Sequence, residues 1–319
     1  MAISWLFRRP GPAPAVDEVR LRADARLHEA WPRWEDLTPE RLRELAAERG
    51  LDLATAVLHD RLLTSPVHGP FIRAIDDIPL HDLPRLSGRL LIVPAHFYRE
   101  QPGYGGDGAI VRKVATALGL DVELIATPST GSLPEAVRLV SEALRREPAP
   151  VTLVTLSKGG ADVRVALEDD PSLAAKVKVW VNLCGLVHGS PLLREIVENP
   201  FWQRALMRTL FRTQGMDMEV LRDLTGAPET RLTRPLALPP GLQVVSVVGV
   251  PLACHLSGNV LARYHRLSPL GPNDGSALIR EAIVEPGAVY PLWGADHYFR
   301  VPQASPLLYR LFVWLSRNL

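Results

Sequence analysis

From about residue 87 onward, short apolar runs alternate with stretches that repeat apolar residues at helical spacing. The apolar runs are short enough to be buried strands and lie at 89–94, 122–126, 151–156, 177–183, 242–248 and 283–292. Helical periodicity is found at 108–118, at 133–144, from 157 onward and at 307–315. Near-continuous apolar strands separated by helices predict an α/β fold with a mostly parallel central sheet and helices on both faces.

The first 85 residues follow another pattern, of helix and turn without strand alternation. Thr38 is typical of a residue that begins a helix and Gly50 of one that ends it, so a helix is predicted between them. We therefore expect two parts, a helical N-terminal lead over 1–85 packed on a main domain over 86–319.

Residues 190–240 interrupt the alternation of strand and helix. They are rich in large, adaptable apolar side chains: Phe201, Trp202, Met207, Leu210, Phe211, Met216 and Met218. We interpret the segment as an inserted helical cap over one end of the sheet, the alternative being an ordinary connection packed against the body. Met207 and Phe211 are candidate substrate-pocket residues, because such side chains adapt to apolar ligands of varied shape. Plain core packing is the alternative for both.

Composition excludes several classes of protein. Lys plus Arg number 36 and Asp plus Glu 35, a net charge of +1, which argues against a nucleic-acid partner. No apolar run reaches the ~18 residues of a membrane-spanning helix, and no targeting segment stands out. Two cysteines, Cys184 and Cys254, cannot form a disulfide framework. We expect a soluble cytoplasmic protein without a membrane span.

The strongest chemical signal is the segment Val154-Thr-Leu-Ser157-Lys-Gly159-Gly160. A buried strand ends just before Ser157 and a helix begins just after it, and small neighbours allow the sharp turn that lifts a serine above a sheet. The backbone N–H of Lys158 can then face a developing oxyanion at the helix N-terminus. We expect the Lys158 side chain to reach into solvent, because a cation opposes the helix dipole there. The alternative is a strand-end turn without chemistry.

This turn resembles the Gly-x-Ser-x-Gly elbow of the α/β-hydrolase superfamily, in particular its lipase and esterase members, with Thr155 in place of the first glycine. Two later segments follow that family's chain order of Ser, Asp and His, so the resemblance covers residues 87–319. Asp274 lies in an Asn-Asp-Gly turn, and His297 lies in an Asp-His loop before the last helix. A serine hydroxyl needs such a base, and a carboxylate to orient it, before it becomes a nucleophile.

The resemblance implies an α/β-hydrolase fold and cleavage of a carboxylic ester through an acyl-enzyme, with Ser157, Asp274 and His297 as a catalytic triad. Asp296 is the rival carboxylate, but adjacent side chains rarely face one another, so Asp274 is preferred. The alternatives are a plain turn residue at Asp274 and a surface histidine at His297. The implied substrate is a small-molecule ester with an apolar acyl group. Acyl transfer or thioester cleavage by the same triad, and a non-catalytic binding protein of this fold, are the other functions considered.

A second oxyanion donor comes, in this family, from the loop after the third strand of the fold. Here that loop is Val93-Pro-Ala-His-Phe-Tyr98, in which Pro-Ala replaces the usual His-Gly. The alignment places the donor N–H at His96, with Phe97 next in line.

A competing pattern, Gly103-x-Gly105-x-x-Gly108, matches the dinucleotide-binding fingerprint. It begins well after the strand ends, whereas the fingerprint follows its strand directly, and no acidic residue ends the next strand. We expect a loop beside the active site and no cofactor. His255 and His265 lack ligand spacing, so no metal site is predicted.

Overall fold

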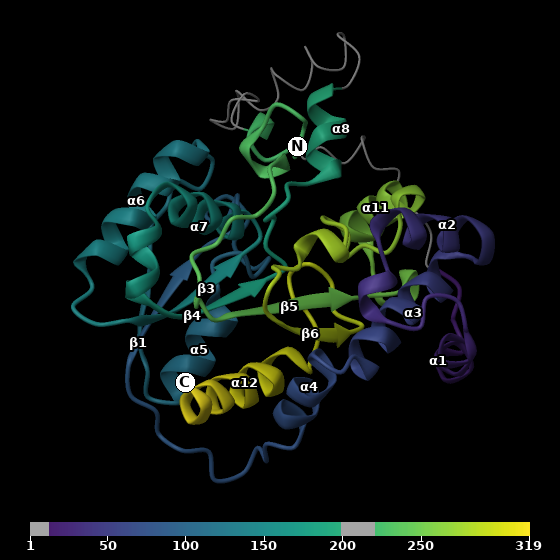
Figure 1. Ribbon diagram of the computed structural model, residues 1–319, viewed down its shortest axis with the longest axis horizontal. Coiled ribbons are helices and arrows are strands. Elements are labelled where there is room, and N and C mark those ends of the chain that lie inside the picture. Colours follow the sequence, from purple (N-terminus) through teal and green to yellow (C-terminus); the bar gives the residue numbers. More distant parts are fainter. Residues whose placement is uncertain (1–12, 199–220) are drawn as a thin grey trace.

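The computed structural model describes residues 13–198 and 221–319, which form a central sheet with helices packed around it (Figure 1). The strands are β1 Arg89–Val93, β2 Asp121–Leu124, β3 Val151–Leu156, β4 Val177–Leu183, β5 Val244–Val250 and β6 Ala288–Trp293. The helices are α1 Glu18–Leu27, α2 Pro39–Arg49, α3 Leu51–Thr64, α4 His68–Asp76, α5 Ala109–Ala117, α6 Leu133–Arg146, α7 Lys158–Asp169, α8 Pro191–Glu198, α11 Gly258–Leu267 and α12 Ala304–Asn318.

The strands form one parallel sheet in the order β2-β1-β3-β4-β5-β6. The chain runs outward from β1 to β2 and then crosses back to β3 on the other side of β1. In open parallel sheets, ligand sites lie at the carboxyl ends of the strands beside such a reversal. Ser157 directly follows the carboxyl end of β3 and therefore stands at that position.

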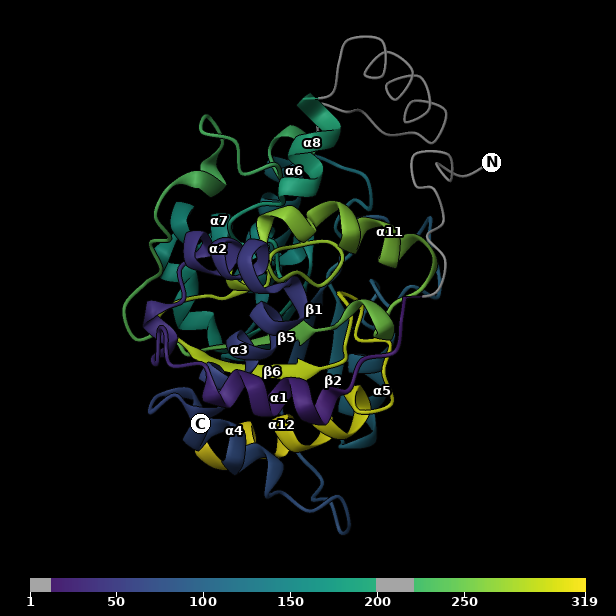
Figure 2. The same ribbon diagram turned by 90° about the vertical axis from the view of Figure 1, so that its right-hand side faces the viewer.

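Helices cover both faces of the sheet (Figures 1 and 2). On one face α4, α5 and α12 pack against residues such as Ile92 and Val154. On the other face α6 and α7 pack against the intervening residues, such as Leu91 and Leu153. Because successive side chains of a strand point to opposite faces, both sets are buried and the strands are apolar nearly throughout. The predicted parallel sheet with two covered faces is confirmed.

The helix α2 begins and ends where the sequence predicts. The Thr38 hydroxyl accepts a hydrogen bond from the N–H of Arg41 at 3.3 Å, and Pro39 takes the first helical position. Gly50 ends the helix with a φ of 94°, which glycine adopts without strain.

The N-terminal helices cover the β6 end of the sheet. On α3, the buried Val57 and Leu62 share a core with β5 and β6, and α4 lies on the opposite face beside α12 (Figure 2). These helices thus use the sheet to bury their apolar sides. The division into a lead over 1–85 and a domain over 86–319 stays a prediction.

The last strand begins later than the sequence predicts. Ile283 and Val284 are fully buried, but they follow a short 3-10 helix, and the Val284 N–H donates to the Ser246 side chain at 3.0 Å. The predicted strand over 283–292 is therefore wrong in its first half. Burial in the core requires apolar side chains there without requiring an extended backbone.

Much of the interpreted cap lies outside the described residues. This applies to all seven large apolar residues: Phe201, Trp202, Met207, Leu210, Phe211, Met216 and Met218. The cap over 190–240 and the pocket role of Met207 and Phe211 stay predictions. In both views α8 extends from the body on the side opposite α12 (Figures 1 and 2). No helix within 13–198 or 221–319 is long and apolar enough to cross a membrane.

Candidate active site

Ser157 alone connects β3 to α7. Its φ of 49° and ψ of −115° are a strained conformation for a residue with a Cβ, and the helix begins at the next residue. Glycines make room for this turn. A Cβ at Gly159 would overlap the carbonyl oxygen of Val93, and a Cβ at Gly160 would lie 2.7 Å from Oδ1 of Asn182. The turn therefore needs both glycines, and it presents the serine at the carboxyl end of the sheet.

Thr155 stands where the elbow of the α/β-hydrolase superfamily has its first glycine. The Thr155 side chain is buried, and its Oγ1 accepts from Nε1 of Trp180 at 2.8 Å and donates to Oδ1 of Asn182 at 2.9 Å. The Asn182 amide donates onward to the carbonyl of Ala282 at 3.0 Å. This polar network satisfies the extra hydroxyl, so the departure from the family pattern leaves the turn intact.

The three residues predicted for catalysis lie in one hydrogen-bonded row, here called the triad. Nε2 of His297 is 2.8 Å from Oγ of Ser157, and Nδ1 of His297 is 2.7 Å from Oδ2 of Asp274. An ionised carboxylate can only accept, so Nδ1 carries the proton and Nε2 offers its lone pair to the hydroxyl. His297 and Asp274 are buried and Ser157 is partly exposed, so the row opens to solvent at the serine.

The turn after Asp274 holds its carboxylate in place. Oδ1 accepts from the backbone N–H groups of Ser276 and Ala277 at 2.9 and 2.8 Å, which leaves Oδ2 for His297. Burial alone would raise the pKa of Asp274, but His297 and these two N–H groups outweigh it and hold the pKa below its ordinary value. The carboxylate stays ionised and can stabilise a charged imidazole.

Asp296, the rival carboxylate, has another partner. Its Oδ2 accepts from Nε and Nη2 of Arg300 at 2.8 and 2.6 Å, and its Oδ1 accepts from the N–H groups of Tyr298 and Arg300. Both oxygens are thus engaged in the loop that follows His297. The structure brings Asp274 to the imidazole and leaves Asp296 with Arg300.

Two backbone N–H groups are candidate oxyanion donors. Lys158 is the first residue of α7, where a backbone N–H has no acceptor within the helix. On the loop after β1, Phe97 has a φ of 61° and its N–H donates to the carbonyl of Ser129 at 2.9 Å. The expectation for Phe97 is therefore not met, because its N–H is engaged by the loop between β2 and α6. His96, directly before it, is the candidate donor on this side.

The Lys158 side chain is buried, and the expectation that it reaches solvent is wrong. Its Nζ lies 2.7 and 2.9 Å from the two carboxylate oxygens of Asp162, one turn further along α7. The partner one turn away decides the direction of the side chain, and the helix dipole does not. Burial, together with the charge of Lys158, lowers the pKa of His96 to about 3, so that imidazole is neutral.

Cys184 lies behind the triad, where no sequence pattern points to it. It follows β4 with a φ of 45°, and its Sγ accepts from the N–H of Gly249 at 3.2 Å. Its sulfur, an oxygen of Asp274 and a nitrogen of His297 lie within 4.8 Å of one another. Burial and then the charge of Asp274 raise the pKa of this thiol well above its ordinary value, so it stays neutral beside the carboxylate.

The glycine-rich loop after β1 lies beside His297. The ring of Tyr104, within this loop, is 5.5 Å from the ring of Tyr298, and the ring of Tyr298 is 5.3 Å from that of His297. The guanidinium of Arg300 lies over both tyrosine rings, 5.4 Å from each centroid. The glycines thus belong to a loop that contacts the candidate site through tyrosine.

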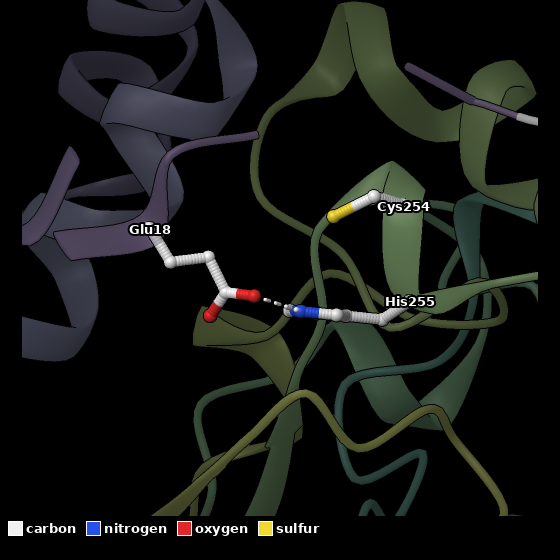
Figure 3. A group of neighbouring side chains, drawn as sticks. All are labelled: Glu18, Cys254 and His255. Atoms are coloured by element: carbon white, nitrogen blue, oxygen red, sulfur yellow. Dashed lines mark hydrogen bonds and ion pairs between the residues drawn. The ribbon is translucent and has the colours of Figure 1, made fainter. Parts of the chain in front are cut away.

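A second group of ligand-type side chains, Glu18, Cys254 and His255, lies where α1 meets the segment after β5 (Figure 3). Nδ1 of His255 accepts from the N–H of Leu252 at 3.0 Å, so Nε2 carries the proton and donates to Glu18 at 3.0 Å. Nε2 therefore has no lone pair for a metal ion. Nε1 of Trp293 donates to the other Glu18 oxygen at 2.5 Å. These hydrogen bonds link α1 to β6 and to the segment after β5, and we assign no metal ion to the group.

Solved structures share this architecture. The chain is similar to a metagenomic carboxyl esterase, with a TM-score of 0.60 and 21% identity over 76% of this chain and 80% of that one. It is similar to the mature form of a lipase from Bacillus licheniformis, with a TM-score of 0.51 and 18% identity over 70% of this chain and 89% of that one. No protein-family profile and no curated protein matches the sequence. At these identities the likeness shows the fold, and the chain has the α/β-hydrolase fold.

Proposed function

We propose that this protein is a serine hydrolase that cleaves carboxylic esters through an acyl-enzyme. One observation carries the proposal: the triad is complete, and its serine stands on a strained turn at the carboxyl end of β3. The printed descriptions of the two similar structures, a carboxyl esterase and a lipase, support ester cleavage as the reaction class. The triad argues against a non-catalytic binding protein, because binding alone needs no base aligned with a hydroxyl.

Acylation uses groups that already lie in place. Ser157 Oγ attacks the ester carbonyl carbon while Nε2 of His297 takes its proton, and Asp274 stabilises the resulting imidazolium. Negative charge develops on the carbonyl oxygen, where the N–H groups of Lys158 and His96 stabilise it. The intermediate then breaks the bond to the alcohol oxygen, which leaves with the proton from His297.

Water completes the cycle. His297 removes a proton from a water molecule, whose oxygen attacks the acyl carbon, and returns that proton to Oγ of Ser157 as the carboxylic acid leaves. Every bond is made and broken by residues of the chain, the ester and water. The chemistry therefore requires no cofactor.

The proposed substrate is a small-molecule ester whose apolar acyl group contacts Met207 and Phe211. If these side chains line the pocket, Met207→Ala or Phe211→Ala should raise KM for an octanoate ester more than for an acetate ester. Each lost contact should weaken the binding free energy of the longer acyl group by about 1–3 kcal/mol. The p-nitrophenyl esters of both acids measure this difference. A lower melting temperature with an unchanged octanoate-to-acetate ratio in both variants would contradict the pocket role.

A fluorophosphonate probe tests the reaction class directly, because it labels serines whose hydroxyl is activated. The intact protein should gain the mass of one probe, and Ser157→Ala should gain none. Ser316→Ala is the matched control, since Ser316 donates to the carbonyl of Val313 within α12 at 2.8 Å and should leave labelling unchanged. An unlabelled wild-type protein that also cleaves no p-nitrophenyl ester would overturn the proposal and favour a binding protein.

A further inference from the structure

The helix α11 lies against the turn that holds the triad carboxylate. The Asn273 amide donates to the carbonyl of Tyr264 at 3.3 Å, and a Cβ at Gly275 would lie 2.6 Å from a methyl carbon of Val260. The residues on either side of Asp274 thus both contact α11, so a shift of the helix would also move the turn that contains Asp274. Its side chains are part of the surroundings of the candidate site.

Arg263 lies on the side of α11 that meets α8 and the loop after His297. Arg266, three residues further and thus a neighbour on the helix surface, pairs with Glu195 of α8 at 2.5 Å. The guanidinium carbon of Arg263 lies 5.7 Å from the ring centroid of Tyr298, and that ring contacts the imidazole of His297. The guanidinium and the catalytic imidazole thus contact the same tyrosine ring.

Arg263 is half-buried, and two of its three guanidinium nitrogens lack a hydrogen-bond partner within the part of the chain that the structure describes. Its Nε and Nη2 are both buried, and neither has a hydrogen-bond acceptor among the described residues. Arg194 and Arg280 also bury one such nitrogen, but each guanidinium makes another polar contact, to a backbone carbonyl and to a glutamate. Burying the N–H groups of a cation costs free energy when they have no acceptor. An acceptor from outside the described residues would therefore stabilise Arg263 in this position.

We propose that Arg263 binds an anionic oxygen group, a carboxylate or a phosphate, carried by the ester substrate. The inference rests on the proposed function and adds a second requirement to the apolar acyl group. A planar guanidinium presents adjacent N–H donors that match two oxygens of such a group, which fixes the substrate in orientation as well as in charge. Its place beside Tyr298 puts that anion next to the reacting ester.

Arg300 offers an internal comparison. It lies over the same Tyr298 ring at 5.4 Å, but its guanidinium is already paired with Asp296 at 2.8 and 2.6 Å. Since its donors and its charge are matched, Arg300 should not select an anionic substrate. If only Arg263 affects the preference for anionic substrates, the cause is its N–H groups without acceptors in the described chain, because both arginines contact the same tyrosine ring.

Two matched pairs of esters test the proposal and distinguish the two anions. One pair is mono-p-nitrophenyl glutarate and its methyl ester, which differ by a carboxylate in the acyl part. The other pair is 1-acetylglycerol 3-phosphate and 1-acetylglycerol, which differ by a phosphate in the alcohol part. Arg263→Gln should lower the anionic-to-neutral ratio of kcat/KM by about tenfold to a hundredfold in at least one pair, mainly through KM. Arg263→Lys should retain part of the ratio, and Arg300→Gln should leave the ratio at its wild-type value.

An unchanged ratio for Arg263→Gln in both pairs, or an equal fall for Arg300→Gln, overturns this inference while leaving ester hydrolysis standing. If the wild-type protein cleaves no ester, the proposed function fails, and calorimetry decides the inference separately. The uncleavable amide N-butylglutaramic acid and glycerol 3-phosphate are then the probes. At least one should bind the wild-type protein and bind Arg263→Gln more weakly; equal affinities, or no binding, reject the proposal. Melting temperatures of both Arg263 variants show whether each is folded.

Discussion

Two connections of this protein lead from a strand to a helix, one of a single residue and one of fifteen, and Gly159 beside the first has closer neighbours than Gly103 in the second. β3 reaches α7 through Ser157 alone, whereas β1 reaches α5 through residues 94–108. In the first turn of α7, directly after the short connection, Gly159 and Gly160 allow backbone segments to approach one another. In the long connection, Gly103 has no described atom within 4 Å of where its Cβ would lie. The number of residues between strand and helix, more than the presence of glycine, decides which connection can present a nucleophile.

The two connections also meet. Gly159 packs against the carbonyl groups of Val93 and Pro94, where the long connection leaves β1. The short connection therefore positions the Ser157 hydroxyl, and the long one positions the candidate donor His96 close by. A change at Gly159 should disturb fold and site together, whereas a change at Gly103, where a Cβ would meet no described atom within 4 Å, should disturb neither strongly.

The largest effect should come from the short connection itself. Ser157→Ala should lower ester hydrolysis by a factor on the order of 10⁴ or more, because no acyl-enzyme can form. The protein should stay folded, since alanine and serine meet similar strain at this φ. Steady-state rates on p-nitrophenyl acetate measure the loss. A variant that keeps more than about a tenth of wild-type turnover would show that the nucleophile lies elsewhere.

The next effect concerns the carboxylate that reaches the short connection through His297. Asp274→Asn should lower kcat on the order of 10³- to 10⁴-fold, because the amide neither stabilises the imidazolium nor fixes its tautomer. Asp296→Asn is the control and should cost far less, since Asp296 pairs with Arg300. Equal losses in the two variants, measured with the same ester, would refute the assignment of Asp274.

A third prediction compares the free energy of unfolding after substitution of Gly159, just after the short connection, and of Gly103, within the long one. Gly159→Ala should cost about 3 kcal/mol, because its Cβ overlaps a backbone oxygen that cannot move freely. Gly103→Ala meets open space and should cost only about 1 kcal/mol, from its positive φ. Urea unfolding of both variants gives the two values. If Gly103→Ala were the more destabilising, close backbone approach would not be what the short connection requires.

The smallest effect should come from the side chain by which the long loop contacts the site. Tyr104→Leu removes a ring contact to Tyr298, which is worth about 0.5–1.5 kcal/mol, so kcat/KM should fall severalfold at most. Tyr309→Leu, on α12 where the partly buried ring packs against the core, serves as the control for a lost tyrosine. A loss as large as that of Asp274→Asn would mean that the long loop takes part in the chemistry.

The fold and the turn at Ser157 could be predicted from short-range patterns, whereas the choice of Asp274 and His297 also needed the resemblance to the α/β-hydrolase superfamily. Apolar runs of strand length define the parallel sheet, and residues after such runs gather at one edge of it. Ser157 directly follows β3, and Asp274 and His297 come after β5 and β6 in the chain order that the resemblance implies. The first and last residues of α2 could be predicted in the same way, from Thr38 and Gly50.

What the sequence misses depends on packing in three dimensions. Lys158 turns inward because Asp162 is buried with it, and the N–H of Phe97 finds a carbonyl on another loop. Ile283 is apolar because it is buried against α3, and no local pattern distinguishes that from a strand. That Nε and Nη2 of Arg263 have no acceptor among residues 13–198 and 221–319 depends on the positions of those residues in three dimensions, which no local sequence pattern gives.

The packing of α3 on the sheet has a consequence for how the chain is made. This helix ends at Thr64, but its core partner β6 begins at Ala288, so the partner is synthesised long after the helix. At about 5–20 residues per second, the delay is on the order of tens of seconds. During that interval Val57 and Leu62 have no strand to cover them. The core that α3 shares with the sheet is therefore complete only after β6 has been made.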